Sequence, residues 1–205
     1  MDEKREAVFT MTNGQIQFPV EQAIRNRRTI KKFKPDTITL EQITELLNIA
    51  VWAPNHKMRE PWRFIVLLDE ARETFVEALQ FESTKGKDAV PMKEAKVNHW
   101  LSIPAYVVVV MEEDPRQHNW DEDYAAVSAL IQNFQLAAWE RGIGMLWNTN
   151  KYIYTPAIRK ELGVVAGEKI VGIMQMGYPA HIPASVERTP AEELLTVFTK
   201  KDFNA

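Results

Sequence analysis

The chain has 205 residues, of which 45% are hydrophobic and 26% charged, a composition typical of a globular protein long enough to bury a core. Its 25 Lys and Arg nearly balance its 28 Asp and Glu, and the net charge of −3 argues against a surface built to bind nucleic acid. Cysteine is absent, which excludes disulfides, thiolate metal sites and a cysteine nucleophile. The first thirty residues lack an apolar signal-peptide core, and the longest apolar run, residues 103–111, is about half of a membrane span. We therefore expect a soluble, cytoplasmic protein with a flexible arm, residues 1–18, before a single domain, residues 19–205.

The first half of the chain predicts three helices and one strand. A short helix is expected over residues 20–28, and a second begins after Thr39, which forms a capping-box pattern with Gln42. The second helix has its apolar positions at helical spacing (Ile43, Leu46, Leu47 and Ala50), and Pro54 ends it. A strand over 63–68 and a helix over 69–81 follow, the helix with the apolar stripe Ala71, Phe75, Ala78 and Leu79. The stretch 83–95 is mixed and polar, and it predicts an exposed excursion.

The second half contains the most apolar segments. Residues 105–111 include four consecutive valines and are β-branched on both faces, which is typical of a central strand covered on each side. The longest helix, 121–141, has almost no polar face and predicts either a central core helix or one shared with a second subunit. Gly142 suits the residue after its end. Strands over 143–147 and 169–177, a helix over 156–162 and a last helix over 191–200 complete an α+β fold with a mixed or antiparallel sheet.

The segment RNRRTIKKFK, residues 25–34, is the first candidate for chemistry. It places six cations within ten positions of an acidic protein: Arg25, Arg27, Arg28, Lys31, Lys32 and Lys34. Such a cluster, with the Thr29 hydroxyl, could clamp a phosphate through charge-assisted hydrogen bonds. A solvated basic face or a nucleic-acid patch fits the same residues equally well.

Other motifs carry weaker signals. The Pro-bounded loop APNHKMREPW, residues 53–62, is typical of a structural connection, although loops on rigid elements often bind ligands. Gly142 and Gly144 form a Gly-x-Gly that follows a helix rather than a strand, so the dinucleotide-binding interpretation fails. The four histidines are scattered without metal-ligand spacing, and no serine sits in a nucleophile-elbow pattern. We expect no metal site and no serine hydrolase.

Four segments, taken in order, resemble the FMN-dependent nitroreductase family. They are AIRNRRTIKKF (23–33), ITLEQITELLNIAVWAPNHKMREPWRFIVL (38–67), AAVSALIQNFQLAAWERGIGMLW (125–147) and IVGIMQMGYP (170–179). The first looks like the family's Arg-Arg-Ser signature, with Thr29 in place of Ser. The second is similar to the family's helix, Ala-Pro loop and Pro-Trp-x-Phe strand, and the last to its closing strand and Gly-x-Pro turn.

The resemblance implies a central mixed sheet flanked by helices, in an intertwined homodimer with two FMN sites at the interface. It implies that the flavin phosphate is bound by Arg27, Arg28, Thr29 and Arg188, and that Lys31 lies near the pyrimidine edge of the ring. Residues implied to approach the flavin from the partner subunit are Trp52, Pro54, Asn55 and His56. Those implied to lie against the ring near N5 are Trp147, Asn148, Thr149 and Asn150.

The implied activity is transfer of a hydride from NAD(P)H to flavin N5 and on to an electron-poor acceptor such as a nitroaromatic or a quinone. The flavin carries this chemistry, so no catalytic side chain is expected. Met58 and Glu60 stand where many members carry Asn and Gln, and Val186 where they carry Lys, which leaves the acceptor and the choice of NADH or NADPH open. One alternative is a flavin-binding protein with an incidental reductase activity. Another is an RNA-binding arm, which the lack of aromatic stacking residues beside the basic segment disfavours.

Overall fold

The computed structural model describes residues 10–12, 15–17, 19–86 and 89–199. Its centre is a four-stranded sheet in the order β3-β4-β6-β5, in which every neighbouring pair is antiparallel. The strands are β3 (Trp62–Leu67), β4 (Ala105–Glu112), β5 (Gly144–Asn148) and β6 (Glu168–Gly177). The expected α+β fold is therefore confirmed, with the sheet antiparallel.

Strand β4 is buried along its length except at Glu112, as its run of valines predicts. Alternate residues of β4 face opposite sides of the sheet, because successive side chains of a strand point to opposite faces. Val107 and Val109 pack with the helices on one side, and Val108 and Val110 with those on the other. The sheet thus separates two hydrophobic cores.

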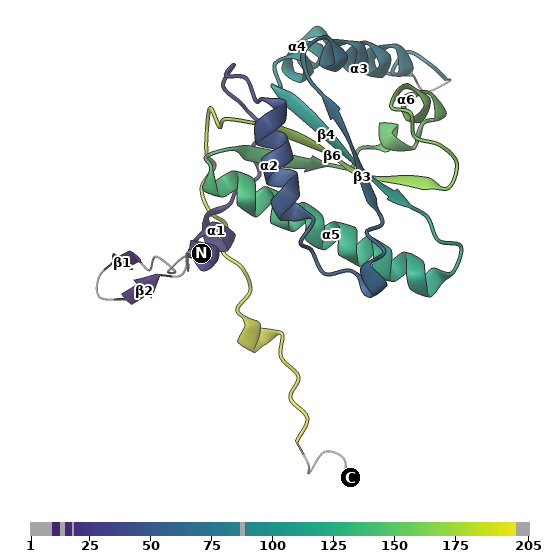
Figure 1. Ribbon diagram of the computed structural model, residues 1–205. Helices are drawn as coiled ribbons and strands as arrows, with labels where there is room; N and C mark the ends of the chain where they lie inside the picture. The colour runs from purple at the N-terminus through teal and green to yellow at the C-terminus, as the bar shows by residue number, and fades with distance from the viewer. Residues whose placement is uncertain (1–9, 13–14, 18, 87–88, 200–205) are drawn as a thin grey trace, which may run out of the picture.

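Helices cover both faces of this sheet (Figure 1). On one face lie α2 (Leu40–Ala50) and the long α5 (Gln117–Glu140). On the other lie α3 (Asp69–Glu82), α4 (Glu94–Leu101) and α6 (Pro156–Glu161). Helix α1 (Pro19–Asn26) contacts α5 beside the first layer. Three short 3-10 turns are η1 (His56–Met58), η2 (Lys151–Tyr154) and η3 (Ala191–Glu193).

Local sequence signals placed several helix ends correctly. The Thr39 hydroxyl accepts a hydrogen bond from the Gln42 amide at 3.3 Å, and the Gln42 side chain accepts one from the Thr39 amide at 3.0 Å, so the capping box is present. Gly142 follows α5 with a φ of 72°, a left-handed conformation that favours glycine. The Ile143 amide then donates to the Ala138 carbonyl at 2.9 Å, which closes the helix end.

Four expectations about the helices need correction. Helix α4 begins at the end of the expected excursion, residues 83–95, and no helix is predicted there, because Trp100 is its one buried residue and no apolar stripe marks it. The helix expected over residues 191–200 is not found in its described part, 191–199. Only the turn η3 forms there, and the described residues around it are exposed. Ala71 is exposed on α3, where Val76 is buried instead. The first helix ends at Asn26, so Arg27 and Arg28 lie beyond it.

Helix α5 is not enclosed within one chain. Leu130 and Phe134 are fully buried in the core, whereas Ala125 and Gln132 are exposed and Leu136 is half-buried. Of the two alternatives for this helix, a central core helix enclosed by its own chain is therefore wrong. The other alternative, a helix packed against a second subunit, stays a prediction.

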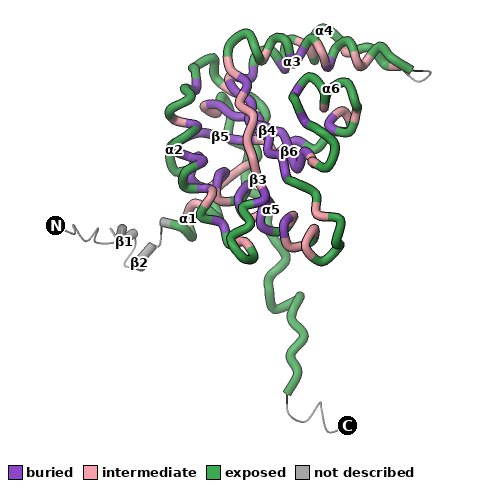
Figure 2. The backbone as a smooth tube through the Cα atoms, turned by 45° about the vertical axis from the view of Figure 1, so that its right-hand side comes forward, coloured by how far each residue is buried: buried purple, intermediate pink, exposed green. Residues whose placement is uncertain are grey.

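The two ends of the described chain lie apart from the sheet. Strands β1 (Thr10–Thr12) and β2 (Gln15–Gln17) pair antiparallel beyond α1, and the rest of the predicted arm, residues 1–18, lies outside the described residues. After β6 the chain runs out as an exposed segment, residues 180–199, that leaves the body of the molecule (Figure 2).

Candidate functional site

Three arginines gather where α1 ends. Burial lowers the pKa of Arg27, and the positive charges of Arg28 and Arg188 lower it further, so both of these arginines lie within electrostatic range of Arg27. Within the described part of the chain none of the three has a carboxylate within 4 Å, whereas nearby Arg25 is paired with Glu21 at 2.7 Å. An unneutralised cluster of this kind suits a phosphate, which is recognised by charge-assisted hydrogen bonds.

Each arginine of this cluster is oriented by neutral acceptors. The Arg28 Nη1 donates to the carbonyls of Arg25 and Arg27, at 2.7 and 2.9 Å. Arg188 Nη1 donates to the Val186 carbonyl at 3.0 Å. Arg27 Nη1 lies 3.5 Å from the side-chain oxygen of Gln135, which is buried on α5. The acceptors fix the side chains and leave their charges available.

The residues after the cluster run along the edge of strand β5. Thr29 pairs with Met145 in a parallel bridge, and the Ile30 amide donates to the Met145 carbonyl at 3.0 Å. A Cβ on Gly144 would lie 2.4 Å from Ile30 Cγ1, so only glycine allows this approach. The second glycine of the Gly-x-Gly thus serves packing of Ile30 rather than a nucleotide.

The predicted segment 147–150 ends this same strand. Asn148 is buried and its side-chain oxygen accepts the Asn150 amide at 3.0 Å, while Thr149 and Asn150 are exposed. The Trp147 indole donates to the Val171 carbonyl at 3.2 Å and packs with the core, so its side chain is already engaged. Asn148 is three residues beyond the position paired with Thr29, which places it about 10 Å along the strand.

The loop between α2 and β3 forms a separate part of the predicted site. Trp52 is 86% exposed, Pro54 and His56 are exposed, and Asn55 is half-buried. No hydrogen bond or ion pair among the described residues joins these four to the arginine cluster. Within one chain the structure therefore brings together Arg27, Arg28 and Arg188 beside Thr29, and leaves the loop apart. Lys31 is exposed on the edge segment.

Sequence reasoning missed three residues that hold these parts in place. Gln135 faces Arg27, and Arg59 forms a fork onto Asp123, which is 2% exposed. Gln135 and Asp123 interrupt the otherwise apolar buried face of α5, and a polar residue on a buried face is the signal that could have found them.

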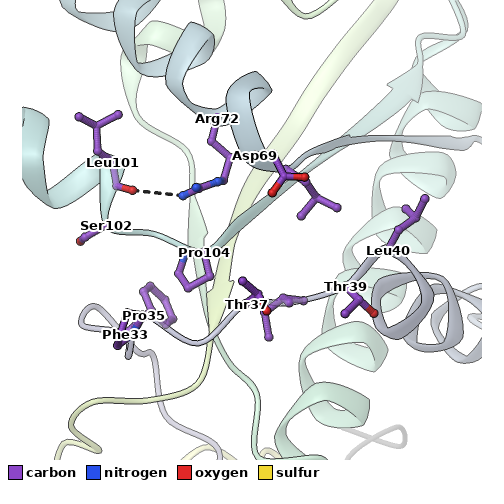
Figure 3. Close-up of a pocket in the computed structure, with 12 residues that line it drawn as sticks. Phe33, Pro35, Thr37, Thr39, Leu40, Asp69, Arg72, Leu101, Ser102 and Pro104 are labelled. Atoms are coloured by element: carbon purple, nitrogen blue, oxygen red, sulfur yellow. Dashed lines mark hydrogen bonds between the residues drawn. The ribbon is translucent and has the colours of Figure 1, made fainter.

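A cavity away from the arginine cluster lies at the junction of β3 and α3 (Figure 3). It has a volume of about 880 Å³, and Phe33, Leu68 and Pro104 form part of its apolar wall. Arg72 borders it, but its Nη1 donates to the carbonyls of Leu101 and Ile103 at the end of α4. The cation of Arg72 is thus already used to cap that helix. The charges of the arginine cluster have no carboxylate partner among the described residues, so we place the functional site there. A smaller groove of about 350 Å³ runs between α1, α2 and α5 and includes Ile49, Trp52 and Leu136.

Membrane-crossing helices and metal-binding clusters are both absent from the described ranges. None of their helices has the length and apolar character needed to cross a bilayer. None of their His, Asp and Glu side chains group in threes that could hold a metal ion.

Comparison with known proteins gives concordant matches. The model of the family described as "Nitroreductase family" matches residues 24–178. YfhC of Bacillus subtilis, which carries the name "Putative NAD(P)H nitroreductase", is 37% identical over 178 residues, covering 84% of this chain and 91% of that protein. A nitroreductase-like family protein from Bacillus cereus is 38% identical, with a TM-score of 0.83, and covers 94% of this chain and 99% of its own. A Desulfovibrio desulfuricans structure in complex with FMN is 25% identical, with a TM-score of 0.71, and covers 89% of this chain and 99% of its own.

Proposed function

The chain belongs to the nitroreductase family, and from that premise we propose that it is an FMN-dependent oxidoreductase. It passes electrons from NAD(P)H to an electron-poor acceptor such as a nitroaromatic or a quinone. The observation that carries this proposal is the cluster of Arg27, Arg28 and Arg188, whose charges have no carboxylate partner among the described residues.

These residues fit the phosphate end of FMN. A phosphate dianion needs several donors, and Arg27, the charges of Arg28 and Arg188 that act on it, and the Thr29 hydroxyl two residues away could provide them. Hydrogen bonds to a charged group each contribute about 1.5–3 kcal/mol. Burial and then repulsion from Arg28 and Arg188 lower the pKa of Arg27, and phosphate binding would offset the repulsion.

The strand beside the cluster fits the rest of the cofactor. Its end at Asn148 lies about 10 Å from the position of Thr29, on the scale of the five-carbon chain between the phosphate and the ring of FMN. When bound, FMN supplies hydride transfer from NAD(P)H and delivery of electrons to the acceptor. Thr149 and Asn150, exposed at the strand end, would orient the ring, and Lys31 would stabilise negative charge at its edge.

A homodimer completes this site. The groove that includes Ile49 and Leu136 leaves apolar surface open beside Trp52, and large exposed apolar patches mark interfaces. A second copy packed there would cover the open face of α5 and bring its own Pro54–His56 loop toward the flavin. That arrangement gives a role to a loop that contacts no part of the arginine cluster in its own chain.

Steady-state kinetics test the reductase activity against simple flavin binding. Purified protein loaded with FMN should oxidise NADH or NADPH rapidly once a nitroaromatic or quinone is added, and slowly without it. A protein that binds FMN but turns over no faster with any acceptor of these classes would favour the alternative, a flavin-binding protein without a reductase role.

His56 is exposed and 3.9 Å from Glu122, and we assign it no role as a proton donor.

A further inference from the structure

The loop from Asn55 to Glu60 adopts a strained backbone. Three of its non-glycine residues have positive φ: Lys57 at 53°, Met58 at 51° and Glu60 at 46°. Backbone strain of this kind costs of order 1 kcal/mol or more per residue and persists only where the surroundings enforce it. Something outside the loop must therefore hold it, because Lys57 is exposed and Met58 is 73% exposed, so that they bury little apolar surface.

One hydrogen bond closes the loop on itself. The side-chain oxygen of Asn55 accepts the Glu60 amide at 3.0 Å. This bond joins the two ends of the loop but ties neither end to the helices. Inside the loop the Arg59 amide also donates to the His56 carbonyl at 3.2 Å. Exposed hydrogen bonds contribute about 1 kcal/mol each, which is too little for these two to enforce three left-handed residues.

Arg59 supplies the external anchor. Its Nε and Nη2 form a fork onto the carboxylate of Asp123 on α5, with distances of 2.8 to 3.2 Å. Its Nη2 also donates to Asp114 at 3.1 Å, in the connection between β4 and α5. Asp123 is 2% exposed, so this pair is far less screened by water than an ordinary surface ion pair. The residue flanked by the strained positions is thus the one that is fixed to the core helix.

We propose that Arg59 and Asp123 are positioning residues of the flavin site: their ion pair holds the strained loop Asn55–Glu60 in the conformation that presents Pro54, Asn55 and His56 to the flavin across the dimer. This inference rests on the proposed function. Its physical basis is that a loop without packing of its own relaxes when its anchor is weakened. The arginine cluster keeps its structure, because no hydrogen bond or ion pair among the described residues joins it to the loop.

A second ion pair in the same molecule provides a matched control. Arg63, four residues farther along the chain, forms a fork onto Glu168 with both distances at 2.6 Å. This pair joins β3 to the start of β6, and no hydrogen bond or ion pair among the described residues links it to the strained loop. Lysine cannot reproduce a planar fork, so Arg→Lys weakens either pair while it keeps the charge.

The test compares Arg59→Lys and Asp123→Asn with Arg63→Lys and Glu168→Gln, all as FMN-loaded enzyme. For the first two variants we expect the Kd for FMN or the KM for the acceptor to rise about tenfold, as for loss of one charge-assisted contact, with kcat changed much less. The visible circular dichroism of bound flavin should change as well. The Arg63 and Glu168 variants should lower thermal stability by a similar amount but leave the Kd, the KM and the dichroism unaltered.

Two results overturn the inference in distinguishable ways. If Arg59→Lys binds FMN, turns over and gives the dichroism of the wild type, the loop needs no anchor, and the proposed function stands. If the wild type itself binds no FMN, the proposed function fails and the inference fails with it. Should Asp123→Asn not fold, Arg59→Lys decides, because Arg59 is partly exposed and lysine keeps a cation beside the buried Asp123 carboxylate.

Discussion

The Trp147 indole lies across Gly172 on the neighbouring strand. The two strands are paired so that Trp147 opposes Met174, two residues from Gly172. A Cβ on Gly172 would lie 2.1 Å from the indole Nε1, and 3.2 Å separates that nitrogen from the Val171 carbonyl that it donates to. The absence of a side chain at residue 172 therefore fixes where the tryptophan packs.

Gly172→Ala should destabilise the protein by displacing this indole. Forcing an additional methyl group into a packed core costs about 1–3 kcal/mol, and the Val171 hydrogen bond would be lost as well. Urea unfolding measures the change. In a Trp147→Leu background the penalty should shrink, because the clashing ring is gone. Equal penalties in both backgrounds would show that the glycine is needed for another reason.

Arg27→Ala should weaken FMN binding by about tenfold or more, the value of one charge-assisted phosphate contact. Arg25→Ala is the charge-matched control, since Arg25 lies two residues away and is already paired with Glu21. Fluorescence titration of FMN into apoprotein gives both dissociation constants. Similar losses from both variants would indicate a diffuse basic surface instead of a phosphate site.

The pairing of Glu168 with Arg63 makes stability depend on pH in the acid range. Hydrogen bonding to Arg63 lowers the pKa of Glu168 from its ordinary 4.5, so the unfolded chain binds a proton more readily than the folded one. The stabilisation is therefore complete above about pH 4.5 and is lost as the pH falls through the lower pKa of the folded state. Asp114, hydrogen-bonded to Arg116, has its pKa lowered and acts in the same direction.

We expect Glu168→Gln to melt at a lower temperature than the wild type at about pH 7. The gap should narrow as the pH falls from about 5 to 2, because the wild type then loses the same charge. Calorimetry across this range measures both curves. A gap that stays constant would mean that the Glu168 charge contributes nothing to folding.

Ile49→Glu should weaken dimerisation and lower FMN content without unfolding the chain. Ile49 is 41% exposed and lines the apolar groove between α1, α2 and α5. Leu130 and Phe134, although apolar and on α5, are unsuitable for this test because both are fully buried in the core of their own chain. Phe81→Glu on α3, 64% exposed and away from the groove, is the control. Sedimentation and flavin absorbance on one sample give the result, and an Ile49→Glu dimer with full FMN would contradict the shared site.

Features encoded within a few residues could be predicted from the sequence. The Thr39 capping box and Gly142 define helix ends through bonds to residues at most five positions away. The valines of β4 predict a central strand because both of its faces are covered. The helix expected near the end of the chain does not form because it lacks packing partners. The segment after Ala191 has Leu194, Leu195 and Phe198 at helical spacing, but they are exposed, and a short helix without packing is marginal.

Contacts between distant residues could not be predicted without the fold. Arg59 and Asp123 are 64 positions apart, and Arg27 and Gln135 are 108 positions apart. Nothing in the local sequence of either partner indicates the other. The resemblance to a family named Arg27, Arg28 and Arg188 together, and the lowered pKa of Arg27 agrees with their grouping. The part of the site that a second subunit would contribute stays a prediction.

The proposal that this protein uses FMN is tested most sharply by identifying the flavin it binds. The purified protein, or apoprotein reconstituted with flavin, is denatured and the released flavin is separated by chromatography and counted against protein. We expect a yellow protein that releases FMN, at about one per chain, and no FAD. The reason is that the chain has the arginine cluster for a phosphate and lacks a dinucleotide-binding fingerprint in its sequence. A colourless protein that takes up no FMN, or one that releases FAD, would contradict it.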